Sequence, residues 1–62
     1  MKKEEAVQYK NKRIRVLIQN GFKFSGEVLE VTADTLVIRD KFGEKVSIRL
    51  ADIMLCSEEV RL

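Results

Sequence analysis

The chain has 62 residues, enough for one domain with a thin margin of stability, because a chain this short buries only about 60% of its unfolded surface. A single cysteine, Cys56, and the absence of histidine exclude an internal disulfide and a zinc-finger ligand set. Of the usual supports for a small domain, self-association remains. The composition, 45% apolar and 35% charged, suits a packed, soluble domain.

The charge is small in total but unevenly distributed. Residues 1–24 carry seven Lys or Arg and two Glu, for a net +5, whereas residues 25–62 carry five basic and eight acidic side chains, for a net −3. Such a dipole can guide a phosphate backbone or the opposite end of another copy. No apolar run approaches the about 18 residues of a membrane span, and the first residues lack the apolar core of a secretory signal, so we expect a cytoplasmic location.

Apolar periodicity predicts a short helix and then a first strand. Residues 4–10 are expected to form about two turns of helix, which must pack against the rest of the fold to persist. In the strand at 12–18, apolar residues recur with a period of two at Ile14, Val16 and Ile18. The Asn20-Gly21 pair then predicts a tight type I′ hairpin, in which both central residues need a positive φ.

Four further strands follow the hairpin. The second, at 22–31, starts with Phe22 and Phe24 in the buried phase, and the phase flips beyond Gly26, which predicts a bulge or sharp bend. Strands at 35–40 and 45–50 are joined by a turn with Gly43 in a left-handed conformation. A last short strand at 53–56 precedes an acidic tail at 57–62.

The expected fold class is therefore all-β, a small five-stranded, strongly bent antiparallel barrel with a short N-terminal helix. Five strands joined by hairpin-length loops favour a small closed barrel. Since the chain has no proline to guard a strand edge, any edge left open would be a site for pairing with another chain.

From about Ala6 to Cys56 the chain resembles the Sm-like family, which includes bacterial Hfq and archaeal Sm-like proteins. The first motif of that family is matched by the apolar strand 14–18, by Gly21, by the aromatic-X-Gly sequence at residues 24–26 and by a loop leading into 35–38. The second motif is echoed by Ile48-Arg49-Leu50 and by Ile53-Met54-Leu55, where Leu50 replaces the glycine of the family.

The resemblance implies a ring of six or seven identical copies, in which the fourth strand of one copy pairs with the fifth of the next, and single-stranded RNA as a ligand. Members that bind uridine commonly have an acidic residue, a stacking side chain and an asparagine between the second and third strands. Here Ala33 or Asp34 stands at the stacking position and Thr35 at the asparagine. The resemblance thus implies Asp34, Thr35 and Arg49 as candidate RNA-binding residues.

Basic and aromatic side chains supply further candidates. A phosphate-contacting face could be formed by Lys12, Arg13 and Arg15, although basic residues on a polar strand face often serve solubility alone. Phe22 and Phe24 are expected in the core, which leaves Phe42, in a turn, as the aromatic available for exposed contact. Tyr9 is expected to pack on the end of the barrel.

Catalytic chemistry finds little support in the sequence. General acid–base and nucleophilic mechanisms need an activated partner near the reacting group, and the chain has no histidine and no glycine-rich phosphate loop. Asp52 is expected to perform turn chemistry, its side chain accepting hydrogen bonds from nearby backbone donors. Cys56 is expected to be a small buried hydrophobe. No signature for a metabolite, cofactor or metal is present.

The leading hypothesis is a homo-oligomeric Sm-like ring that binds single-stranded RNA through backbone charge and loop contacts. Two alternatives remain open. The first is a barrel of the Src-homology or Tudor type that serves as a protein-interaction module, favoured by the near-neutral net charge and the acidic tail. The second is a ring that acts only as a scaffold.

Overall fold

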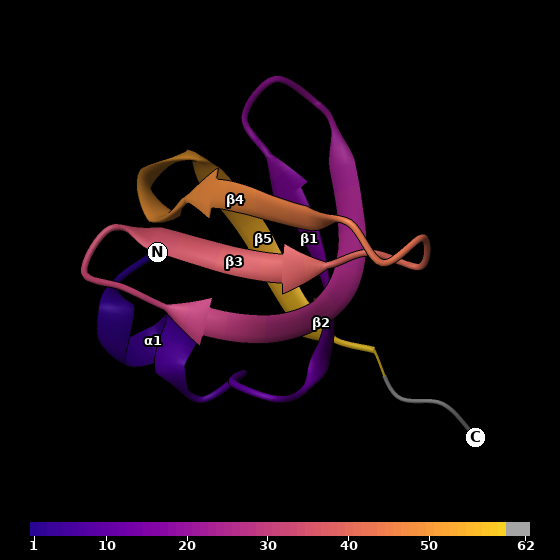
Figure 1. Ribbon diagram of the computed structural model, residues 1–62. Helices are drawn as coiled ribbons and strands as arrows, with labels where there is room; N and C mark the ends of the chain where they lie inside the picture. Colours follow the sequence, from indigo (N-terminus) through magenta and orange to yellow (C-terminus); the bar gives the residue numbers. More distant parts are fainter. Residues whose placement is uncertain (60–62) are drawn as a thin grey trace.

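The computed structural model describes residues 1–59, which form a short helix and one bent antiparallel sheet (Figure 1). The elements are, in chain order, α1 Lys3–Val7, β1 Arg13–Ile18, β2 Lys23–Val31, β3 Thr35–Arg39, β4 Lys45–Arg49, the 3₁₀ helix η1 Leu50–Asp52 and β5 Ile53–Glu58. No helix of this described part is long and apolar enough to cross a membrane.

The five strands follow the order β4-β3-β2-β1-β5, and every neighbouring pair is antiparallel. The predicted all-β class and the five strongly bent strands are confirmed. The predicted closure is wrong, because β4 and β5 lie at the two edges and are not paired with each other. Four successive antiparallel pairings leave β4 and β5 running in the same direction along the sheet, so the two edges cannot complete an antiparallel ladder.

The core lies on the concave face of the bent sheet. Period-two alternation turns one set of apolar side chains inward from each strand, as β1 shows with Ile14 and Val16 buried between exposed or half-buried neighbours. The buried hydrophobic side chains are Ala6, Ile14, Val16, Val28, Leu36, Ile38, Ile48, Leu50 and Ile53. Each fully buried aliphatic side chain contributes about 1.5–3 kcal/mol.

The helix α1 covers one end of this core with Ala6, which is fully buried. It spans Lys3–Val7 rather than the expected 4–10. Beyond Val7 the backbone changes to i→i−3 hydrogen bonds, from Lys10 N to Val7 O and from Lys12 N to Tyr9 O, which are too tight to continue an α-helix. Asn11, at φ 66°, then redirects the chain into β1, since asparagine tolerates the left-handed region.

The hairpin between β1 and β2 differs from the predicted type I′ turn. Gly21 has φ 91°, but Asn20 is not in the positive-φ region. Ile18 N donates to Phe22 O and Gly21 N donates to Ile18 O, which closes a three-residue loop of the kind that ends with glycine in a left-handed conformation. Asn20 contributes through its side chain instead, because its Oδ1 accepts a hydrogen bond from Phe22 N at 3.1 Å.

In β2 the bulge and the glycine, which the sequence placed together near Gly26, lie at different positions. The register shift lies between Val28 and Glu30, so Leu29 is the bulged residue and the phase flips there. Gly26 has another role, since a Cβ built on it would collide with the carbonyl oxygen of Arg39 in β3. Glycine therefore allows β3 to approach the bent strand closely.

The last two strands also differ from their expected ends. Leu50 is expected in the fourth strand, but β4 ends at Arg49 and Leu50 opens η1, where it remains buried. The fifth strand is expected to stop at Cys56, whereas β5 continues to Glu58 because Ser57 and Glu58 pair with β1. Of the predicted acidic tail, residues 60–62 lie outside the described chain.

Candidate nucleic-acid interface

The β2–β3 loop and the end of β4 lie side by side, which brings three predicted site residues together. Thr35 is paired with Arg49 across the β3–β4 ladder, and Leu50 N donates to the carbonyl oxygen of Asp34 at 2.9 Å. These segments border a depression of about 410 Å³, lined by Met1, Ala33, Asp34, Arg49, Leu50 and Ala51.

Hydroxyl groups fix the shape of the β2–β3 loop. Thr32 N donates to Thr35 O at 2.8 Å, and Thr35 N donates to Thr32 Oγ1 at 3.1 Å. The Thr35 hydroxyl donates to Asp34 Oδ1 at 3.0 Å. The Asp34 carboxylate is thereby held against its own loop, and its remaining lone pairs stay available to a donor from a ligand.

Arg49 is the cationic side chain of this depression, which Met1 also lines with its N-terminal ammonium donating to Leu50 O at 3.0 Å. Its side chain is exposed at the end of β4, and no ion pair involves it within residues 1–59. A guanidinium that is not already paired can donate several N–H groups to a phosphate or stack on a base. Asp34 and Arg49 thus offer an acceptor and a cation within one depression, and the Thr35 hydroxyl lies beside it, bonded to Asp34.

The three basic candidates Lys12, Arg13 and Arg15, in β1 and just before it, lie elsewhere and are already paired. Lys12 Nζ lies 3.5 Å from Glu58 Oε1, and Arg13 Nε lies 3.6 Å from Glu59 Oε1. Arg15 Nε lies 3.8 Å from the other carboxylate oxygen of Glu59. The structure therefore does not bring this group to Asp34 and Arg49, and Glu58 and Glu59 together offset two of its three charges.

A row of charges crosses the outer face of the sheet at this end. Glu59 N donates to Arg13 O at 2.8 Å, Arg13 is paired with Glu27, and Glu27 is paired with Arg39. The row ends at Lys45, the partner of Arg39. Thr35 and Arg49 occupy the opposite ends of β3 and β4, so the two groups of candidates sit at separate ends of the sheet.

The aromatic residues divide differently from the prediction. Phe42 is 78% exposed in the β3–β4 turn, as expected, with Lys41 Nζ at 5.2 Å from its ring centroid. Phe22 is expected in the core but is 63% exposed, because it lies just outside β2, where the ladder no longer constrains its face. Phe24 and Tyr9 are partly buried against the core.

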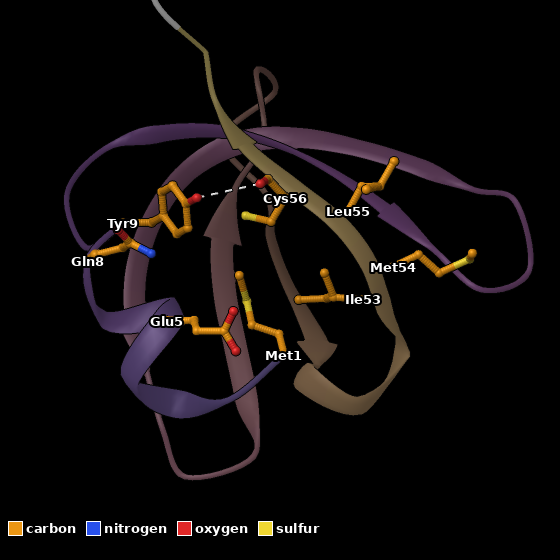
Figure 2. Close-up of a pocket in the computed structure, with 8 residues that line it drawn as sticks. All are labelled: Met1, Glu5, Gln8, Tyr9, Ile53, Met54, Leu55 and Cys56. Atoms are coloured by element: carbon orange, nitrogen blue, oxygen red, sulfur yellow. Dashed lines mark hydrogen bonds between the residues drawn. The ribbon is translucent and has the colours of Figure 1, made fainter.

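A second groove, which the sequence did not suggest, lies between α1 and β5 and has a volume of about 380 Å³. Figure 2 shows Met1, Glu5 and Tyr9 facing Ile53 and Cys56 of β5 across it. The Tyr9 hydroxyl donates to the Cys56 carbonyl oxygen at 3.5 Å. The Cys56 thiol is half-buried, and burial raises its pKa above the ordinary 9.0. The thiol therefore stays protonated near neutral pH and is a poor nucleophile.

An aspartate side chain accepts backbone hydrogen bonds in a turn, but it is Asp40 and not the predicted Asp52. Asp40 Oδ1 accepts hydrogen bonds from Phe42 N and Glu44 N, both at 2.9 Å. The side chain of Asp52, by contrast, has no hydrogen bond within the described residues, and only its carbonyl oxygen accepts one, from Gln19 N. Asp40 thus has the capping role that the sequence predicts for Asp52.

A scan against models of protein families and a search of curated proteins both give no match to this chain. The resemblance to the Sm-like family therefore rests on the motif residues alone.

Proposed function

We propose that this chain is an Sm-like protein that assembles into a ring of identical copies and binds single-stranded RNA, without catalysing a reaction. The observation that carries the proposal is the order of the sheet, which leaves β4 and β5 at its two edges. The Sm-like resemblance implies pairing between the fourth strand of one copy and the fifth of the next. The two strands that such an assembly requires are the two with a free edge.

The physical need for a partner supports the assembly. An edge strand presents a row of unpaired N–H and C=O groups, and a chain of 62 residues has little core with which to offset them. A contact between two different edges is heterologous, and repeating it closes a ring when the rotation between copies divides a full turn. Each copy would then gain one ladder at either side.

The depression at Asp34, Thr35 and Arg49 supports RNA as the ligand. Arg49 is exposed and unpaired in the described chain, and the hydroxyl and carboxylate beside it hold fixed positions. A ring would repeat this group once in every copy. Repetition raises the affinity for a flexible polymer through effective concentration, even where one site alone is weak.

Native mass spectrometry combined with fluorescence anisotropy tests both halves of the proposal. A mass of six or seven copies is expected, together with binding of uridine-rich or adenine-rich RNA that weakens as salt rises. Arg49→Ala should lower RNA affinity by about tenfold, the loss expected for one charge-assisted hydrogen bond. Arg39→Ala is the matched control, since Arg39 is exposed at the other end of β3.

The outcomes separate the two halves. A stable monomer at all concentrations would exclude the ring, and an absence of binding at low salt would exclude RNA. Equal losses for Arg49→Ala and Arg39→Ala would show general charge attraction in place of a site at Asp34. A cytoplasmic location belongs to the same proposal, and cell fractionation tests it.

One observation favours a second candidate, a ring or module that serves only as a protein scaffold. The ion pairs of Glu58 and Glu59 offset two of the three charges of Lys12, Arg13 and Arg15, which lowers the charge that a phosphate backbone would contact. This candidate predicts a native assembly or a protein complex with no salt-dependent affinity for RNA.

A further inference from the structure

The outer face of β1, β2 and β5 carries an apolar groove that the proposed RNA site does not include. The register places Leu17 of β1 between Lys23 of β2 and Leu55 of β5. The groove has a volume of about 280 Å³ and is lined by Arg15, Val16, Leu17, Lys23, Leu55 and Ser57. We call it the Leu55 groove.

Leu17 and Leu55 are apolar on a face whose outward positions are mostly polar, Val37 of β3 being another apolar residue there. An antiparallel sheet with one solvated face carries polar side chains there, as Arg15 of β1 and Ser57 of β5 do. Leu55 is nonetheless 66% exposed, and Leu17 beside it is only half-buried. The core does not use this pair, so its presence on the outer face indicates a surface that another molecule covers.

Cationic side chains flank the apolar floor of the groove. Lys23 is exposed and takes part in no ion pair between the residues that the structure describes. Arg15 is 66% exposed along its side chain, and its contact with Glu59, at 3.8 Å, is of a kind that contributes little. A complementary ligand therefore combines an apolar group with negative charge.

We propose that the Leu55 groove docks a segment of a partner protein in which a large apolar side chain lies between carboxylates. The apolar side chain covers Leu17 and Leu55, and the carboxylates pair with Lys23 and Arg15. An RNA base fits less well, because the floor is aliphatic and has no aromatic ring on which a base would stack.

This docking is independent of the ring and of RNA binding. It uses side chains that stand perpendicular to the sheet, whereas strand pairing uses the main-chain edge of β5. The groove also lies on β1, β2 and β5, away from Asp34 and Arg49 on the β2–β3 loop and β4. Failure of either proposal therefore leaves the other standing.

Fluorescence anisotropy with three labelled synthetic peptides tests the proposal on the full chain. The peptides repeat Glu-Leu-Glu, Lys-Leu-Lys and Glu-Ser-Glu, so that charge and apolar content vary separately. Only the Glu-Leu-Glu peptide is expected to bind. Leu55→Thr should weaken its binding about tenfold or more, because the apolar contact is lost while strand propensity is kept. Lys23→Glu should weaken it as well and reduce its dependence on salt.

Phe42→Thr is the matched control, because Phe42 is a more exposed apolar residue on a turn outside the groove, and it should leave binding unchanged. Equal binding of the Glu-Leu-Glu and Glu-Ser-Glu peptides would overturn the proposal, as would an unchanged affinity of Leu55→Thr. Displacement of the peptide by uridine-rich RNA, with Leu55→Thr weakening RNA to the same degree, would assign the groove to nucleic acid. Urea midpoints equal to that of the parent protein would show that the variants remain folded.

Discussion

At the scale of single residues, the glycines of this chain meet two different physical demands. Gly21 and Gly43 have φ of 91° and 81° with open space where a Cβ would lie. Glycine is therefore favoured at both positions by the backbone conformation alone. Gly26 is limited by space, because β3 brings the Arg39 carbonyl oxygen and the Asp40 Cα, at 3.4 Å, against the position of its Cβ. The cost of a side chain therefore follows different rules at the two kinds of site.

Gly26→Ala should lower the free energy of unfolding by about 1–3 kcal/mol, since two strands must move apart to accept a methyl group. Gly26→Asn should be worse, as the larger side chain meets the same backbone. At Gly21 the order reverses, because asparagine tolerates a positive φ better than alanine does. Urea denaturation of the four variants measures these differences. An asparagine that rescues position 26 would contradict the close approach of β3 as the reason for glycine there.

At the scale of elements, period-two alternation placed β1 and β4 well, because each of these strands buries one face and exposes the other. Prediction from local sequence failed where the same short sequence is compatible with two structures. Asn20-Gly21 suits two hairpin types, and the choice between them depends on how β1 and β2 twist together. The flip near Gly26 indicated a bulge, yet its position at Leu29 is set by the pairing with β3, which no local pattern contains.

The pairing of β5 with β1 places acidic residues beside the basic start of β1. Glu58 and Glu59 lie far from Lys12 and Arg13 in the sequence, and only the β1–β5 pairing brings them together. The sequence alone therefore predicts the basic strand as an open face. Such exposed pairs contribute about 0–1 kcal/mol each to stability, so their larger effect is on the surface charge that a polyanion meets.

Glu58→Gln with Glu59→Gln should strengthen binding to heparin, because the double change leaves Lys12, Arg13 and Arg15 without carboxylate partners. The measurement is the salt concentration of elution from a heparin column, which should rise. Glu4→Gln with Glu44→Gln is the control, with an identical change of net charge at exposed positions on α1 and the β3–β4 turn. Equal elution of the two double variants would show that net charge alone governs binding. Glu58 and Glu59 would then not shield the basic residues that they contact.

At the scale of the whole molecule, the number of strands decides what the fold can be. The sequence predicts five bent strands but also closure, and an odd number of strands cannot close when every neighbour is antiparallel. Only the order of the strands in the sheet shows that closure is excluded. That order depends on the β1–β5 pairing, in which Val16 lies opposite Cys56, a residue far away in the chain. The β3–β4 ladder places Thr35 beside Arg49, two residues that the motif resemblance named separately as candidates for RNA binding.

The two free edges make stability a function of protein concentration. If copies pair through β4 and β5, the folded state is stabilised by mass action, and each tenfold rise in concentration adds about 1.4 kcal/mol of association free energy. For a domain of this size the thermal midpoint should rise by about 6–11 °C per tenfold step. Met54→Lys should abolish the rise, because Met54 is 59% exposed on edge strand β5 and a lysine there opposes pairing. Phe42→Lys should preserve the rise, because Phe42 lies in the β3–β4 turn, outside the strand residues of both edges. A midpoint independent of concentration in the parent protein would mean that its edges remain unpaired in solution.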